Sequence, residues 1–186
     1  MPARLDRADG DVHAAGNPHL HLDPRNIAAV GAGLARRLAD LDGANAAWYA
    51  ARQKTFAEKW TAAMQGWEAK AAPLRGVAVV VYHKDWVYLE NWLGLKQVAT
   101  IEPKPGVAPG AAYLAQLLQD VPARGVKLIL YAAYQEARAA QFVAEKSGVP
   151  AVMLPFTVGG TERATDLYGL FDDSINRLLA GVGTTR

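Results

Sequence analysis

The sequence predicts an α/β protein: a C-terminal lobe with a four-stranded parallel sheet flanked by helices, preceded by a long connecting helix. From about residue 76 onward, short apolar runs alternate with helical stretches four times, which is typical of a parallel sheet with right-handed crossovers. The region 24–72 shows helical periodicity only. Of the 186 residues 51% are hydrophobic, enough to bury a core.

Two helices are predicted ahead of the sheet. Asp23 followed by Pro24 is a helix start, with an aspartate N-cap and proline at the first helical position. An apolar stripe then recurs at three- and four-residue spacing as far as Asp42-Gly43: Ile27, Val30, Leu34, Leu38 and Leu41. A second helix is predicted from about 45 to 72, roughly 40 Å long at about 1.5 Å per residue. Pro73 ends it.

Four strand-helix units follow. Strands are predicted at 77–83, 97–103, 126–132 and 151–155. Helices are predicted from about Asp85 to Gly94, over 109–120, from 135 to Gly148, and over 162–180. In such sheets ligands bind at the carboxyl ends of the strands.

The composition excludes several classes of function. Lys and Arg number 20 against 18 for Asp and Glu, and they are scattered, so no nucleic-acid footprint is expected. Without cysteine there is no disulfide scaffold, thiolate catalysis or cysteine zinc site. No apolar run reaches the roughly 20 residues that span a bilayer, so no membrane insertion is expected. The start "MPARLDRADGDVH" has no apolar core, so we expect no secretory signal in this chain.

Three of the four histidines cluster in "DVHAAGNPHLHLDPRN". Neutral imidazole is the commonest ligand for zinc-like ions, and a turn before a helix can hold it rigidly. His19 is therefore a candidate ligand, with helix capping or plain exposure as the alternative. His21 shares a face with His19 if the segment is extended, as a ligand or a bystander. His13 is expected to be solvated.

His83 stands at the carboxyl end of the first strand, where a ligand or a satisfied strand-end histidine is expected. Glu102 shares that rim as a ligand, as a partner that orients an imidazole, or as a carboxylate in water. The glycines of "TVGGT" (157–161) lack a phosphate-binding fingerprint and favour a tight turn. The tryptophans are predicted to lie in the core or at a lobe interface: Trp48, Trp60, Trp67, Trp86 and Trp92.

Together, "GNPHLHLDPRN", the two-helix stretch, "VVYHKDWVYLENWLGL" and "EPKPGVAPGAAYL" resemble the metal-binding solute receptors of ABC importers, the ZnuA and TroA type. The resemblance covers nearly all of residues 11–181. It implies two α/β lobes joined by a rigid helix, with a metal ion in the cleft. It divides the chain into a remnant of the N-terminal lobe with the ligand loop (1–24), a helical connector (25–73) and the C-terminal lobe (74–186).

The resemblance also implies that His19 and His83 are metal ligands. Two features depart from the family. A further histidine is expected from an N-terminal lobe ahead of residue 11, and an aspartate from the loop after the last strand, where Thr157 has no carboxylate neighbour. Either water or a remote carboxylate completes the site, or Asp166 reaches in. Fewer carboxylates favour Zn²⁺ over Mn²⁺.

The implied function is a non-enzymatic periplasmic receptor, or its C-terminal portion, that delivers zinc to an ABC permease. With two ligands the chain should bind zinc weakly, and less well at low pH, because only neutral imidazole ligates. Exposed apolar surface is expected to favour a homodimer. The alternative is a small doubly wound enzyme or anion-binding domain that uses His83, Glu102 and the Gly159-Gly160 turn.

Overall fold

The computed structural model describes residues 16–184 and confirms the α/β fold. Its sheet has the strand order β2-β1-β3-β4, with every pair parallel. The strands are β1 (Ala78–Val81), β2 (Lys96–Thr100), β3 (Leu128–Ala132) and β4 (Ala151–Leu154). Val80 of the central β1 lies in register with Ala99 and Ile129. Three consecutive valines form most of β1, and such a continuous β-branched run is expected where both faces of a strand are covered.

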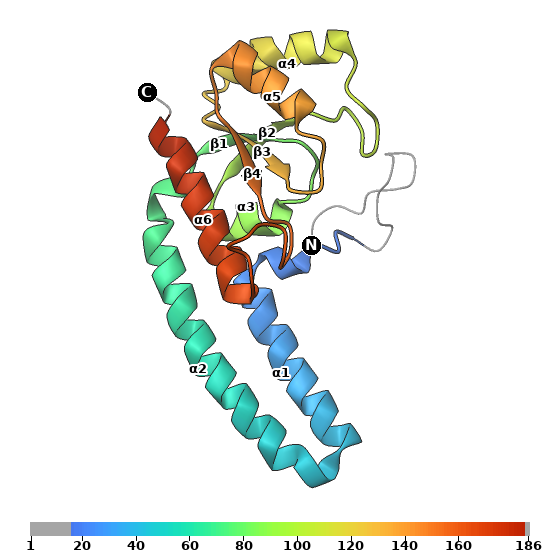
Figure 1. Cartoon of the computed structure of the whole chain (residues 1–186), viewed down its shortest axis with the longest axis vertical. Coiled ribbons are helices and arrows are strands. Elements are labelled where there is room, and N and C mark those ends of the chain that lie inside the picture. The colour runs from blue at the N-terminus through green and yellow to red at the C-terminus, as the bar shows by residue number, and fades with distance from the viewer. Residues whose placement is uncertain (1–15, 185–186) are drawn as a thin grey trace.

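Helices cover both faces of the sheet (Figure 1). On one face α4 (Ala111–Ala123) and α5 (Arg138–Ser147) pack on Val80 and Ile129. On the other, α3 (Val87–Leu93), α6 (Leu167–Thr184) and the end of α2 (Ala46–Lys70) pack on Val79 and Val81. The first and third strands are therefore followed by helices on opposite faces, which opens a crevice between their carboxyl ends.

A helical hairpin extends away from the sheet (Figure 1). It consists of α1 (Pro24–Leu41) and α2, joined by a short turn at Gly43–Asn45. The carboxylate of Asp23 accepts the backbone N–H of Arg25, which is the predicted N-cap. Trp60 Nε1 donates to the carbonyl of Pro24 at 2.8 Å, so the two helices are linked near the sheet. Within residues 16–184, none of the helices combines the length and the hydrophobicity of a membrane-spanning segment.

Most predicted boundaries agree with the structure to within a few residues, but the start of the last helix does not. Gly94 and Gly148 end α3 and α5 with φ of 72°, a left-handed cap that glycine adopts without strain. The last helix begins at Leu167 rather than near 162, because the Asp166 carboxylate accepts the N–H of Gly169 and starts the helix there. Trp48, which the sequence places in the core or an interface, is 60% exposed.

Candidate metal centre

The carboxyl ends of all four strands meet at one edge of the sheet, and residues 17–21 lie against that edge. Asn17 fixes the start of this segment: its side-chain amide donates to the carbonyl of Lys84 at 3.1 Å. Its side-chain oxygen accepts the N–H of His19, and Tyr88 donates to its carbonyl. The Asn-Pro-His turn is thereby held against the turn that follows β1.

His21 fixes the other end of the segment. Its Nε2 lies 2.9 Å from the carbonyl oxygen of Phe156, just after β4, and because a carbonyl only accepts, Nε2 carries the proton. The segment is not extended as expected, since Leu20–Leu22 form a single 3₁₀ turn. Both imidazoles still contact the Phe156 ring edge to face, at centroid distances of 5.1 Å for His19 and 5.3 Å for His21.

Asp85 lies between the two predicted histidine ligands. Its Oδ1 is 4.0 Å from Nδ1 of His19 and 3.9 Å from Nε2 of His83. The side chain of Asp85 is only 1% exposed, against 16% for His19 and 23% for His83. The structure thus brings His19 and His83, which are far apart in the sequence, to a single carboxylate oxygen.

Glu102, just beyond the end of β2, orients His83. Its Oε2 lies 2.7 Å from His83 Nδ1 and also accepts the backbone N–H of Gly106 at 3.2 Å. With Nδ1 donating to the carboxylate, the lone pair of the neutral imidazole is on Nε2, the nitrogen that faces Asp85. Of the roles considered for Glu102, the contacts match the partner that orients an imidazole.

The second oxygen of Asp85 is held by the residues that follow β3. The Tyr134 hydroxyl and the Gln135 side-chain amide both donate to Oδ2, each at 2.9 Å. Loss of water around the phenol, together with the negative charge of Asp85, raises the pKa of Tyr134 above its ordinary value. Tyr134 therefore stays protonated as a donor, and Asp85 keeps Oδ1 turned toward the imidazoles.

The chemical types of the three donors suit a zinc-like ion, but the distances between them are longer than in a metal-bound site. Two imidazoles and a carboxylate are common ligands for zinc and its neighbours. Among residues 16–184, no three His, Cys, Asp or Glu side chains are grouped closely enough to hold an ion as they stand. Neighbouring donors on a tetrahedral zinc are about 3.3 Å apart for bonds of about 2.0–2.1 Å. The observed 3.9 and 4.0 Å exceed that by a margin that side-chain rotation can close.

Other predicted residues lie in different roles. The exposed Asp166 caps α6 through Gly169. Gly160 N–H donates to the carbonyl of Thr157, and Gly159 has φ of 83°, so "TVGGT" forms the predicted tight turn. His13 lies outside the described residues.

Sequence reasoning missed Asp85, Tyr134 and Gln135. The sequence predicts that a helix starts at Asp85, but α3 begins at Val87 and Asp85 lies in the turn before it. Their sequence signal is a position just after the first and third predicted strands, which is informative only once the strand order is known. In the strand order seen here, β1 and β3 are neighbours, so polar side chains just after each of them must meet.

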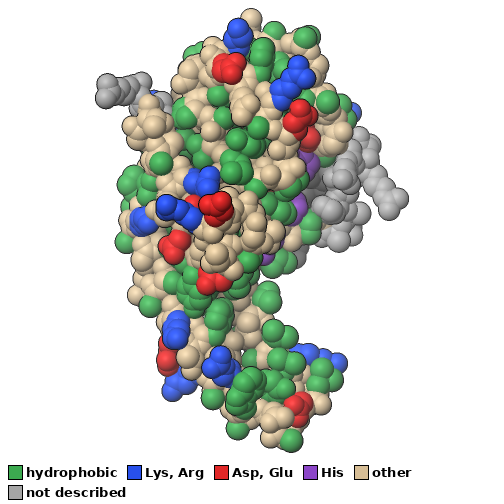
Figure 2. Space-filling view, in the orientation of Figure 1, with side chains coloured by type: hydrophobic (Ala, Val, Ile, Leu, Met, Phe, Trp, Pro, Cys, Tyr) green, Lys and Arg blue, Asp and Glu red, His purple; other side chains and the backbone are tan. Residues whose placement is uncertain are grey.

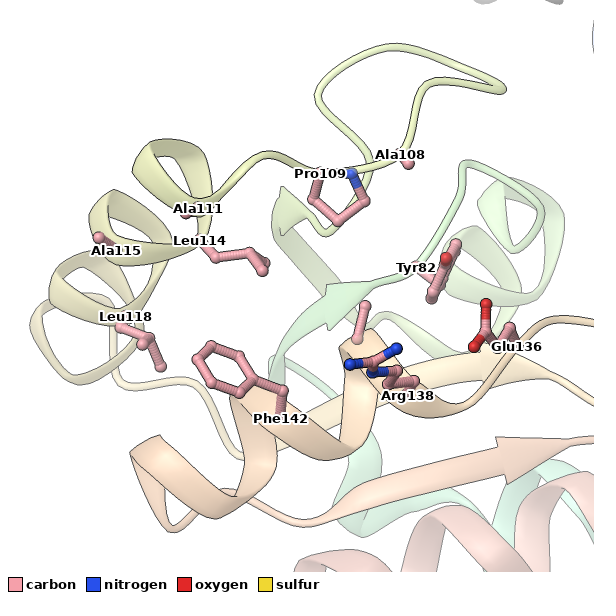
Figure 3. Close-up of a pocket in the computed structure, with 11 residues that line it drawn as sticks. Tyr82, Ala108, Pro109, Ala111, Leu114, Ala115, Leu118, Glu136, Arg138 and Phe142 are labelled. Atoms are coloured by element: carbon pink, nitrogen blue, oxygen red, sulfur yellow. The ribbon is translucent and has the colours of Figure 1, made fainter.

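A separate cavity of about 500 Å³ lies between α4 and α5. Figure 3 shows Leu114 and Leu118 of α4 facing Phe142 of α5, with Glu136 and Arg138 at the other end. Of the described residues that line it, none is a histidine and only Glu136 has a carboxylate, so this cavity does not have the ligands of a zinc site.

Comparison of the chain with known proteins identifies its family. The family model described as zinc-uptake complex component A, periplasmic (ZnuA), matches residues 2–181. The high-affinity zinc uptake system protein ZnuA of Brucella abortus (strain 2308) is 31% identical over 111 residues, which are 60% of this chain and 33% of that protein. The zinc-binding protein AdcA of Streptococcus pyogenes serotype M1 is 25% identical over 155 residues, 83% of this chain and 30% of that protein. The chain spans about a third of the length of these relatives.

Solved structures share the fold. A crystal structure of ZnuA superposes with a TM-score of 0.73 at 22% identity, covering 90% of this chain and 62% of that one. The solute-binding protein FpvC from Pseudomonas aeruginosa in complex with Mn²⁺ gives 0.71 at 22% identity, covering 96% and 68%. Since the family model covers nearly the whole chain, the protein belongs to the ZnuA family of periplasmic zinc-uptake components.

Proposed function

We propose that this chain is the metal-binding portion of a solute receptor that captures Zn²⁺ and delivers it to the permease of an ABC importer. One observation carries the proposal: His19 and His83, from segments 64 residues apart, converge on Asp85 at the carboxyl edge of the sheet. The relatives named as zinc-uptake and zinc-binding proteins support zinc as the cargo. A neighbour of the same fold in complex with Mn²⁺ leaves manganese as a second, less favoured ion.

The same proposal covers location, organisation and chemistry. The chain acts in the periplasm, as a binding protein and not as an enzyme. Residues 1–24 carry the metal-ligand loop, 25–73 form the helical connector, and 74–186 form the C-terminal lobe. The alternative of an enzyme or anion site gains no support from the relatives, which are named as zinc-uptake and zinc-binding proteins.

Replacing either histidine ligand is expected to remove most zinc binding. Calorimetric titration of the metal-free chain with Zn²⁺ at neutral pH should show one site, weakened about a hundredfold in His19→Ala and in His83→Ala. Removing only a hydrogen-bonding partner of a ligand already lowers metal affinity by about tenfold to a hundredfold. Equal loss in the two variants would show that both histidines hold the same ion.

His21→Gln is the matched control, because its amide can still donate to the Phe156 carbonyl that His21 Nε2 contacts. It should bind zinc within about threefold of the unaltered chain, well below the loss expected for a ligand. Unchanged zinc affinity in both His19→Ala and His83→Ala would rule out the site.

We further propose that the isolated chain self-associates through the hairpin. Val30, Leu34 and Trp48 are between 53% and 60% exposed and line one groove of about 450 Å³. Figure 2 shows hydrophobic side chains over this arm of the molecule. An exposed apolar patch of this kind favours burial against a partner.

Sedimentation velocity should show a concentration-dependent dimer, and Leu34→Glu should weaken the association at least about tenfold by placing a charge in the groove. Ala62→Glu, at an exposed site of α2 outside the groove, is the control and should leave the dimer intact. A single monomeric species at every concentration would contradict this proposal.

A further inference from the structure

We propose that Asp85 is itself a metal ligand and supplies the carboxylate that is missing around Thr157. The inference rests on the proposed zinc site and names a residue that the sequence analysis does not identify as a candidate ligand. Oδ1 is the coordinating atom, and Oδ2 is the atom that the protein holds in place.

The two oxygens of the Asp85 carboxylate have different surroundings. Oδ2 accepts from both Tyr134 and Gln135 at 2.9 Å, which fixes the plane of the carboxylate. Oδ1 then faces the imidazoles of His19 and His83 at nearly equal distances, 4.0 and 3.9 Å. Ligating carboxylates are held in this way by hydrogen bonds from outside the ligand set.

Burial supports the same assignment. The Asp85 side chain is 1% exposed, and an anion withdrawn from water requires compensating charge or hydrogen bonds. Tyr134 and Gln135 are neutral donors, so they satisfy hydrogen bonds without supplying positive charge. No lysine or arginine forms an ion pair with Asp85 among the described residues. A divalent cation at Oδ1 supplies that charge.

The other carboxylates proposed for the site have different roles. Glu102 binds His83 through Nδ1, the nitrogen that faces away from Asp85. Asp166 accepts the N–H of Gly169 at the start of α6. The structure therefore leaves Asp85 as the carboxylate that faces both imidazoles. An anionic oxygen also suits harder ions, so the site should accept Mn²⁺ more readily than a site of imidazoles and water.

The first test compares zinc affinities by competition with a chromophoric chelator. Asp85→Asn keeps the shape and can keep both hydrogen bonds, but it loses the charge. We expect its zinc affinity to fall about a hundredfold, at the upper end of what the loss of a partner of a ligand costs. Asp166→Asn, which can still cap α6, is the matched control and should bind like the unaltered chain.

The second test separates coordination from a merely positioning role. The chain contains no cysteine, so Asp85→Cys introduces its only thiolate. With Co²⁺ as the probe, we expect an intense near-ultraviolet sulfur-to-metal charge-transfer band in Asp85→Cys. The band should be absent in Asp166→Cys.

The outcomes distinguish the two proposals. If the histidine variants lose zinc while Asp85→Asn binds normally and Asp85→Cys gives no band, the zinc site stands and the role of Asp85 is overturned. If Asp85→Asn binds weakly but the cobalt band is absent, Asp85 positions the imidazoles and is not a ligand, which also overturns the inference. If the unaltered chain binds no zinc, both proposals fail together.

Discussion

Replacing Trp60 with alanine is expected to lower the free energy of unfolding by about 3–5 kcal/mol, the usual cost of truncating a fully buried tryptophan. Trp60 is 0% exposed and stacks on Phe56 at a centroid distance of 5.3 Å. Its edge contacts join α2 to α6 through Tyr168 and Phe171. The change also leaves the Pro24 carbonyl without its 2.8 Å donor, so it removes packing and a hydrogen bond together.

Urea unfolding followed by circular dichroism measures this effect. Trp48→Ala is the matched control, because Trp48 lies on the same helix but is 60% exposed, and it should change stability by no more than about 0.5 kcal/mol. Similar losses in the two variants would mean that Trp60 does not join the hairpin to the lobe.

The Glu90→Gln substitution is expected to stabilise the protein by about 3 kcal/mol above neutral pH, at about 1.4 kcal/mol per pKa unit. Glu90 is 8% exposed in α3, and its Oε1 has no hydrogen-bond partner within the described part of the chain. Burial disfavours the charged form and raises its pKa from 4.5 to about 7. The folded state therefore holds the proton to a higher pH than the unfolded chain does.

The sign of the pH dependence follows from that difference. Below the unfolded pKa of about 4.3 both states are protonated, so the unaltered protein and the Glu90→Gln variant should have equal stability. As pH rises from about 4.5 to about 7, the unfolded state releases its proton first, and the unaltered protein loses stability. Above about 7 the difference reaches its full value.

Urea midpoints of the two proteins should therefore coincide at acidic pH and separate through this range. Glu58→Gln, at an exposed position of α2, is the control for the loss of one carboxylate. A constant difference between Glu90→Gln and the unaltered protein at all pH values would show that burial does not shift this titration.

Local sequence signals predicted the framework of this protein well. Asp23-Pro24 begins α1, and the glycines at 94 and 148 end α3 and α5, because capping chemistry depends on a few adjacent residues. The helical periodicity of α2 distinguished it from the strands, which are short, continuous apolar runs. Trp48 lies outside the core, because periodicity shows which face a residue occupies but not whether another element covers that face.

The site was predicted only in part, for a related reason. His19, His83 and Glu102 were candidates because each stands at a turn or strand end. The pairing of Glu102 with His83 depends on β2 lying beside β1, and the contact of Asp85 with Tyr134 depends on β3 lying on the other side. Strand order is a property of the whole chain, so no short stretch of sequence contains it.

Two hydrogen bonds that hold residues 17–26 run from an asparagine side chain to a backbone carbonyl. Asn17 donates to the carbonyl of Lys84, and Asn26 donates to the carbonyl of Leu20 at 2.9 Å. Every residue type carries a backbone carbonyl, and the side chains of Lys84 and Leu20 are themselves exposed. Replacing either asparagine therefore removes a hydrogen bond, whereas replacing Lys84 or Leu20 leaves the accepting carbonyl in place.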